Sequence, residues 1–548
     1  MRRAPVALVA ALAALPAAGQ PTLTIGITQF PATFHPHIEQ MAAKYYVLGM
    51  AYRPITVHGH DWKPACMACT VLPTLENGGA VAEPGTDGQQ GVAVTYELPD
   101  WFRWGDGRPV TAEDVVFTWE AGREPRSGMG PAEFYRRLVR IEVDSPRRFT
   151  LHFDRLAFDY NSLGQFAPLP AHIERPIWQA DPASWRTRTT YDTATTTPGL
   201  WNGPFRIAAV APGASVTLER NPTWGGPPPV FGRIVVRTIE NTPALEAQLL
   251  AGQLDMIAGE LGLPLDQALA LEKRAGGRFA FHYQPGLVYE HLDLLLDNPI
   301  LADLRVRQAL ILALDRRQIS ERLFGGRQAV ASTFVNPLDW VYDAATPAWP
   351  FDAPRARALL EQAGWTPGAD GIRRDPAGER LVLDFMTTAG NRSREVVQQV
   401  LQAAWRQVGI EARIRNEPPR VFFGETLSHR RFGAIAMFAW ISSPENVPRT
   451  ILHGDEIPRA ETNFSGQNYP GFRDAEMDDL LERLPYELDR ERRRAMWARV
   501  QAIYAEQLPV IPLFFRADAH VWPRWLAGVR PTGHLNPSTL WVEAWRRE

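Results

Sequence analysis

The most informative stretch of this chain is Trp101-Phe-Arg-Trp-Gly-Asp-Gly-Arg-Pro-Val-Thr-Ala-Glu-Asp-Val-Val-Phe-Thr-Trp-Glu120. Its Gly-Asp-Gly segment, residues 105–107, has the composition of a turn. Thr111 is followed three residues later by Asp114, a spacing typical of helix N-termini, because such side chains accept hydrogen bonds from amides that lack a partner within the helix. The stretch therefore predicts a turn and then a helix that begins near Thr111.

The N-terminus has the pattern of a secretory signal peptide. Arg2 and Arg3 form a charged segment, residues 4–15 an apolar core, and Ala17-Ala18-Gly19 a small-residue cleavage site. We therefore expect residues 1–19 to be removed on export. The apolar run is shorter than the roughly 20 residues that span a bilayer, and no cysteine directly follows it to carry a lipid, so the expected location is the periplasm. The two arginines also permit twin-arginine export, although the usual continuation of that pattern is missing.

Length and charge limit the classes of protein to which the chain can belong. With 548 residues, it exceeds the roughly 250–300 residues beyond which one hydrophobic core usually splits, so two or three domains are expected. The formal net charge is -3, which gives no general attraction to nucleic acid. No Ser/His/Asp, His-Glu-x-x-His or glycine-rich phosphate-binding motif occurs. The sequence gives no support for an enzyme, a cofactor or a nucleic-acid partner.

Short strands and capped helices follow one another along the chain. Asp315, with Gln318 three residues later, is expected to cap a helix that ends at Gly325-Gly326. The apolar run 508–515 predicts a strand, and its prolines indicate a position at the edge of a sheet. Further strands are expected at 23–28, 93–98, 149–153, 216–219, 234–238, 381–386, 410–415 and 434–440, and further helices at 304–314, 352–364, 394–408, 474–484 and 490–507.

The strand at 434–440 indicates a binding site. Its apolar run is short and lies between Gly433 and Ser442, as expected for a buried strand. In open α/β sheets, ligands lie outside the carboxyl ends of the strands, so the segment Trp440–Asn446 is a candidate site. Trp440 offers a broad aromatic face that can contact a ligand with little loss of side-chain entropy.

Several motifs in a fixed order resemble family 5 of the bacterial extracellular solute-binding proteins, the peptide and nickel receptors of ABC importers. They are residues 101–120, Gly203-Pro204-Phe205, 218–222, 305–315, 463–466 and 508–513. The resemblance implies an α/β, type II periplasmic-binding-protein fold, in which two lobes are joined by a hinge and accompanied by an inserted α+β domain. On this basis we expect a signal peptide over 1–19, lobe I over 20–55, 199–285 and 508–548, the inserted domain over 56–198, and lobe II over 286–507.

The resemblance also implies a function. A ligand that contacts both lobes favours the closed form, and the closed form is recognised by the membrane permease. We therefore expect a monomeric periplasmic receptor, without a cofactor, that captures peptides or peptide-like solutes for an ABC transporter permease. The alternatives are a nickel or metallophore receptor of the same family, and a periplasmic sensor or chaperone that uses the fold without transport.

Candidate ligand contacts lie at the loops that border the cleft in such receptors. In peptide-binding relatives, an aspartate shortly after the tryptophan of the 434–440 strand resembles an anchor for the α-amino group of the peptide. The loop that follows Trp440 here lacks this aspartate. A buried ammonium needs a paired carboxylate, so either Glu445 replaces the aspartate or the ligand has no free ammonium at that point. The candidate residues are Phe34, His37, Tyr289, Trp440, Ser442, Ser443, Glu445 and Asn463.

The two cysteines of the chain are Cys66 and Cys69. In an oxidising compartment, such a pair more often forms a local disulfide than a metal site. Free thiols are a further possibility. A metal cluster would need imidazole ligands as well, and the candidates in this part of the chain are His35, His37, His58 and His60.

Overall fold

The computed structural model describes residues 21–39, 41–130, 132–163, 166–462 and 464–548. Eleven strands in these ranges form one sheet with the order β17-β16-β18-β12-β19-β11-β1-β10-β9-β8, to which β13 is added beside β19. Their bounds are β1 Thr22–Ile27, β8 Phe205–Ala211, β9 Ser215–Arg220, β10 Arg233–Thr238, β11 Met256–Ile257, β12 Phe279–Leu294, β13 Ala329–Val330, β16 Val382–Thr387, β17 Glu411–Ile414, β18 Ile435–Ile441 and β19 Val510–Pro523. The expected signal peptide lies outside the described residues.

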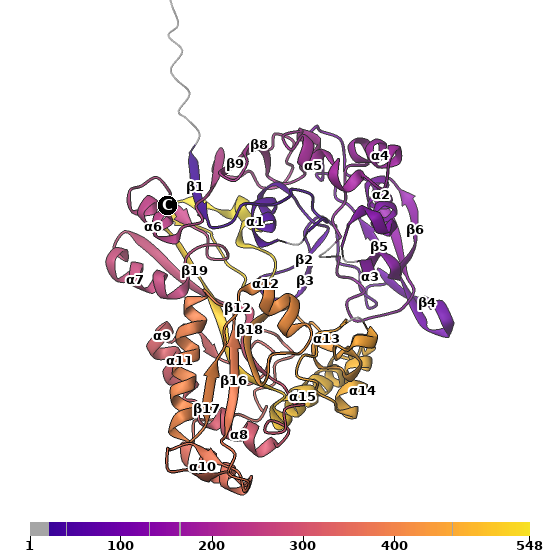
Figure 1. The fold of residues 1–548 in the computed structure, drawn as a ribbon. Coiled ribbons are helices and arrows are strands. Elements are labelled where there is room, and N and C mark those ends of the chain that lie inside the picture. Colours follow the sequence, from indigo (N-terminus) through magenta and orange to yellow (C-terminus); the bar gives the residue numbers. More distant parts are fainter. Residues whose placement is uncertain (1–20, 40, 131, 164–165, 463) are drawn as a thin grey trace, which may run out of the picture.

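The long strands β12 and β19 connect the two halves of this sheet and run side by side through the middle of the molecule (Figure 1). We call the half built on β1 and β8–β11 lobe I, and the half built on β16–β18 lobe II. β19 pairs with β11 toward lobe I, and β12 pairs with β18 toward lobe II. Between Pro285 and Tyr289 the register of β12 against β19 shifts. The two lobes are therefore joined through a pair of strands with an irregular centre.

The proline-containing strand is not at an edge. β19 lies between β12 and β11 inside the sheet, so the prediction of an edge strand over 508–515 was wrong. Pro509 precedes β19, and Pro512 lies opposite His291, beside a second register shift. A proline cannot donate a backbone hydrogen bond. It is tolerated here because the regular ladder is already interrupted at this position.

A second sheet, with the strand order β4-β5-β7-β6, lies beside lobe I. Together with α2–α5 it forms what we call the inserted unit (Figure 1). The bounds are β4 Ala80–Pro84, β5 Gln90–Glu97, β6 Leu138–Ser145, β7 Arg148–Phe153, α2 Ala112–Arg123, α3 Ala132–Arg137, α4 Ala171–Ala180 and α5 Thr190–Thr193.

The predicted cap of α2 is confirmed, and the Asp114 carboxylate also accepts hydrogen bonds from residues outside this helix. Asp114 Oδ2 accepts hydrogen bonds from the Thr111 amide at 2.9 Å and from the Trp104 indole at 3.1 Å, and Oδ1 accepts from the Ala171 amide at 2.8 Å. Burial raises the pKa of this carboxyl above its usual value, and these hydrogen bonds offset only part of the rise. The stretch 101–120 thus joins the turn, α2 and α4 of the inserted unit.

Lobe II and the remainder of lobe I carry most of the helices. Asp315 accepts a hydrogen bond from the Gln318 amide at 2.9 Å, and Gly325, with φ +57°, ends the helix, which confirms both predictions for α9. The bounds are α1 Ala42–Ala51, α6 Thr242–Leu250, α7 Leu265–Ala275, α8 Leu304–Leu312, α9 Arg316–Phe324, α10 Ala353–Gln362, α11 Arg392–Gln407, α12 Pro419–Val421, α13 Arg449–Leu452, α14 Ala475–Arg483 and α15 Arg490–Gln507. Small two-stranded sheets are formed by β2 Thr56–His58 with β3 Pro64–Cys66, β14 Thr366–Pro367 with β15 Arg373–Arg374, and β20 Leu526–Ala527 with β21 Arg546–Arg547.

The buried apolar residues form two large clusters. One includes Leu23 of β1, Trp104 and Trp201, and fills the inserted unit and the part of lobe I built on β1 and β8–β10. The other includes Leu310 and Trp405 of lobe II. In the part of the chain that the structure describes, we find no helix that is both long and apolar enough to cross a membrane.

Cys66 and Cys69 are joined by a disulfide. The amides of Met67 and Ala68, inside the closed loop, both donate to the carbonyl of Ile55 at 3.0 Å. Because the loop is short, its closure entropy is small, and we expect the double substitution of both cysteines by serine to reduce the free energy of unfolding by about 2 kcal/mol. Urea denaturation followed by tryptophan fluorescence measures this change. Reduced wild-type protein is the control and should match the variant; an unchanged midpoint would contradict the prediction.

Candidate functional site

Two of the predicted aromatic residues meet in the centre of the large sheet. Trp440 of β18 and Tyr289 of β12 are register partners, and both line a cavity of about 10 Å³. The ring of His291 is stacked against both, with centroid separations of 5.1 Å to Tyr289 and 6.3 Å to Trp440. On its other side, Trp440 is stacked on Tyr469 at 6.0 Å. These contacts hold the indole in one orientation.

The two residues differ in what they offer to a ligand. Tyr289 is only 3% exposed, and its hydroxyl forms a hydrogen bond with that of Tyr504 at 2.8 Å. Burial raises the pKa of the Tyr289 hydroxyl well above its usual value, so it stays protonated. Trp440 is partly exposed. The exposed aromatic surface therefore belongs to Trp440, and Tyr289 supports it from the neighbouring strand.

The loop after Trp440 begins at the carboxyl edge of lobe II. β16 and β18 are parallel, so their carboxyl ends, at Thr387 and Ile441, lie on the same edge of the sheet. Ile441 is 69% exposed, and Ser442 and Ser443 are partly exposed. The structure thus places Trp440 and both serines where the general rule for α/β sheets puts a ligand.

Glu445 lies in the same loop but is held by other residues of lobe II. One carboxylate oxygen accepts a hydrogen bond from the indole of Trp340, and the other pairs with the guanidinium of Arg493. Its amide donates to Asp339 at 2.7 Å. Burial raises the pKa of Asp339 to about 6, because it disfavours the charged carboxylate. Loop 442–446, all of which the structure describes, contains one carboxylate, that of Glu445, and both of its oxygens already have partners.

A buried ion cluster follows Tyr289 in β12. Arg394 Nε lies 3.2 Å from both carboxylate oxygens of Glu290, and Arg516 of β19 pairs with the same group. Burial alone would raise the pKa of Glu290, but the two guanidinium groups more than offset this and lower it. The trio carries one surplus positive charge, and the side chain of Arg516 is 36% exposed. Arg516 also interacts with the carboxyl of Asp518, but burial raises the pKa of that carboxyl to about 7, so it neutralises Arg516 only in part at neutral pH. Our sequence reasoning missed the cluster, although a glutamate within an apolar strand was an available signal.

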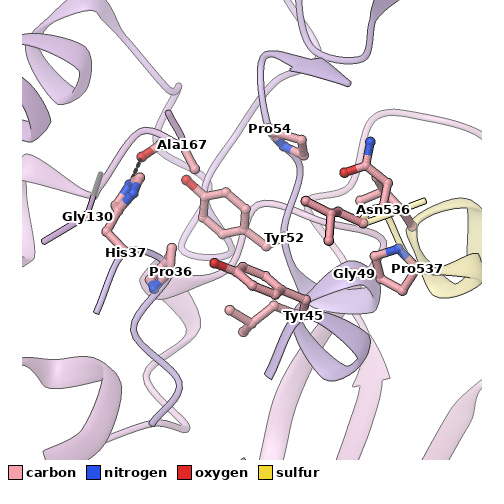
Figure 2. A pocket seen from close by; sticks show the side chains of 13 residues that line it. Pro36, His37, Tyr45, Gly49, Tyr52, Pro54, Gly130, Ala167, Asn536 and Pro537 are labelled. Carbon is pink, nitrogen blue, oxygen red and sulfur yellow. Dashed lines mark hydrogen bonds between the residues drawn. The ribbon is translucent and has the colours of Figure 1, made fainter. Parts of the chain in front are cut away.

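An apolar pocket of about 160 Å³ lies in lobe I beside the inserted unit. Figure 2 shows the rings of Tyr45 and Tyr52 between Pro36 and His37 on one side and the C-terminal segment 535–540 on the other. Nε2 of His37 lies 2.7 Å from the carbonyl oxygen of Ala167. None of the 13 lining residues carries a carboxylate, ammonium or guanidinium group. The pocket therefore suits an uncharged group.

The other predicted residues lie elsewhere. Phe34 is 5% exposed and packs edge-on against Phe30 at 6.2 Å, within the core of lobe I. Asn463 lies outside the described residues. The ring of His35 is buried against the edges of Trp185 and Tyr191, at 5.1 Å from each. No group of three or more His, Cys, Asp or Glu side chains among the described residues is arranged to hold a metal ion.

Comparison with known proteins identifies the family. The family model described as "Bacterial extracellular solute-binding proteins, family 5 Middle" matches residues 79–457 of this chain. The oligopeptide-binding protein AppA of Bacillus subtilis is 25% identical over 448 residues, which cover 80% of this chain and 78% of AppA. The nickel-binding periplasmic protein of Escherichia coli is 23% identical over 439 residues, covering 79% and 77% of the two chains.

A solved structure shows the same architecture. The oligopeptide-binding protein of Thermus thermophilus, complexed with a pentapeptide, superposes with a TM-score of 0.71 and 28% identity over 94% of this chain and 95% of that one. The expected two-lobe type II fold is thereby confirmed. The chain belongs to family 5 of the bacterial extracellular solute-binding proteins.

Proposed function

We propose that this protein is a periplasmic receptor that captures peptides or peptide-like solutes between its two lobes and delivers them to the permease of an ABC importer. The observation that carries the proposal is the connection of the lobes through β12 and β19, with Trp440 partly exposed at the carboxyl edge of lobe II. Such a connection permits hinge closure around a ligand that contacts both sides. Export through the signal peptide, a monomeric state, the predicted domain boundaries and the absence of catalysis are part of the proposal.

The chemistry of the site narrows the ligand. The uncharged pocket of lobe I and the indole of Trp440 suit apolar side chains. Because both oxygens of Glu445 are engaged within lobe II, we do not assign that residue as the anchor of a peptide ammonium. The surplus positive charge at Arg516 instead favours an anionic group, such as a carboxylate. An anionic metal–chelator complex satisfies the same charge, which keeps a metallophore as the second candidate.

Ligand binding is expected to close the lobes and to reduce the radius of gyration, because a ligand that contacts both lobes favours the closed form. Native mass spectrometry of protein purified without denaturation identifies a co-purifying solute. Small-angle scattering of the protein without this solute and after its addition then measures the change in the radius of gyration. A solute that raises thermal stability but leaves the radius of gyration unchanged would contradict hinge closure.

Replacing Trp440 by alanine is expected to weaken binding of that solute by up to about 3 kcal/mol, because the variant loses a large, preoriented aromatic contact. Isothermal titration calorimetry measures the affinity. Trp525→Ala, which removes a partly exposed indole in the C-terminal segment, is the matched control and should bind normally. Equal affinity of folded Trp440→Ala and wild-type protein would place the ligand elsewhere.

A further inference from the structure

The inserted unit contacts lobe II through the segment that connects β7 to α4. The amide of Phe158 donates a hydrogen bond to the carbonyl of Pro485 at 2.9 Å. The guanidinium of Arg155 lies 3.2 Å from the centroid of the Tyr486 ring, and that of Arg493 lies 3.4 Å from the centroid of the Phe158 ring. Figure 1 shows α14 and α15 of lobe II beneath the inserted unit. These contacts join segments more than 300 residues apart.

Arg493 links Phe158 of the inserted unit to Glu445 of lobe II. One face of its guanidinium is covered by Phe158, while Nη2 pairs with the carboxylate of Glu445. Its side chain is 7% exposed, so little water screens the pair. Arg490 stacks on Trp340, the other partner of Glu445, at 4.2 Å. Phe158 of the inserted unit thus contacts the guanidinium that pairs with Glu445 in the loop following Trp440.

The conformation of Glu445 shows that this loop depends on its partners. Its φ of +53° lies in the left-handed region, which non-glycine residues rarely occupy and which costs free energy. The hydrogen bond from its amide to Asp339 and the ion pair with Arg493 hold it there. If the ion pair weakens, one of the contacts that hold Glu445 in this region is lost.

We propose that Arg493 is a positioning residue that couples closure of the inserted unit onto lobe II to the conformation of loop 442–446, a role that rests on the receptor function proposed above. Docking of Phe158 excludes water from the guanidinium, which strengthens its attraction to Glu445. The closed form therefore orders the loop that follows Trp440. Coupling is reciprocal, so a ligand that holds this loop also favours docking of Phe158.

The test compares Phe158→Ala with wild-type protein, both free of ligand. Phe158 is partly exposed, and the variant is expected to fold. In the ligand-free protein the open and closed forms are in equilibrium, and loss of the Phe158 contact shifts this equilibrium toward the open form. We therefore expect a larger radius of gyration by small-angle scattering, and about fivefold faster hydrogen exchange in the segment 441–447 but not in β16 or α11. Phe158→Tyr retains an aromatic face and should behave as wild type. Phe351→Ala, which removes an exposed phenyl group elsewhere in lobe II, is the control for loss of an aromatic ring.

Two results would overturn the proposal. If Phe158→Ala expands the particle but leaves exchange in 441–447 unchanged, the contact docks the lobes without positioning the loop. If neither quantity changes, Phe158 does not hold the closed form. Both measurements use protein without ligand and test only the coupling through Phe158. Failure of the proposed receptor function would appear instead in the native mass spectrometry and in the scattering experiment with solute.

Discussion

Replacing Asp114 by alanine is expected to reduce the free energy of unfolding by about 3–5 kcal/mol. The carboxylate is buried and accepts hydrogen bonds from Trp104, Thr111 and Ala171. Its removal leaves these donors without a partner in a region closed to water, and the start of α2 loses its cap. Urea denaturation followed by circular dichroism measures the loss.

The neighbouring residue supplies the control for this experiment. Glu113 lies in the same first turn of α2 but is exposed, so Glu113→Ala should change stability by less than about 1 kcal/mol. Asp114→Asn keeps one acceptor oxygen and should fall between the two. Equal stability of Asp114→Ala and Glu113→Ala would show that the hydrogen-bonded cluster contributes nothing measurable.

Replacing Glu290 by glutamine is expected to cost about 3–5 kcal/mol at neutral pH, because it leaves the guanidinium groups of Arg394 and Arg516 without their carboxylate in a largely buried site. The folded-state pKa of Glu290 is lowered, so its ionised form contributes stability above the pKa of the unfolded chain, about 4.3. That contribution is lost as the pH falls through the folded-state pKa.

The pH dependence distinguishes this ion cluster from ordinary packing. The stability difference between wild type and Glu290→Gln, measured by urea denaturation from pH 7 to pH 3, should decrease below about pH 4. Glu321→Gln, at an exposed position in α9, should show a negligible difference throughout. A difference for Glu290→Gln that stays constant over the whole range would contradict a role of the charge.

The elements that were predicted correctly depend on residues close together in the chain. The caps at Thr111 and Asp315 and the strand ending near Trp440 follow from spacing within a few positions. The edge position of the strand over 508–515 was wrong for the opposite reason. Whether a strand lies at an edge depends on whether distant segments pair with both of its sides. Here β12 pairs with one side of β19 and β11 and β13 with the other, and no property of residues 508–515 contains that information.

The candidate site, too, was predictable from the sequence in part only. The sequence by itself determined the family motifs, the helix caps and the aromatic residue at the end of a buried strand, because local sterics, hydrogen bonding and hydrophobic periodicity act over short distances. Only the tertiary structure decided that Glu445 pairs with Arg493 and accepts a hydrogen bond from Trp340. It likewise decided that Glu290 pairs with Arg394 and Arg516, which are 104 and 226 residues away. Charges are abundant along this chain, and each could pair with many others. The choice among them is made by the path of the backbone, which brings specific partners together out of water where pairing is strong.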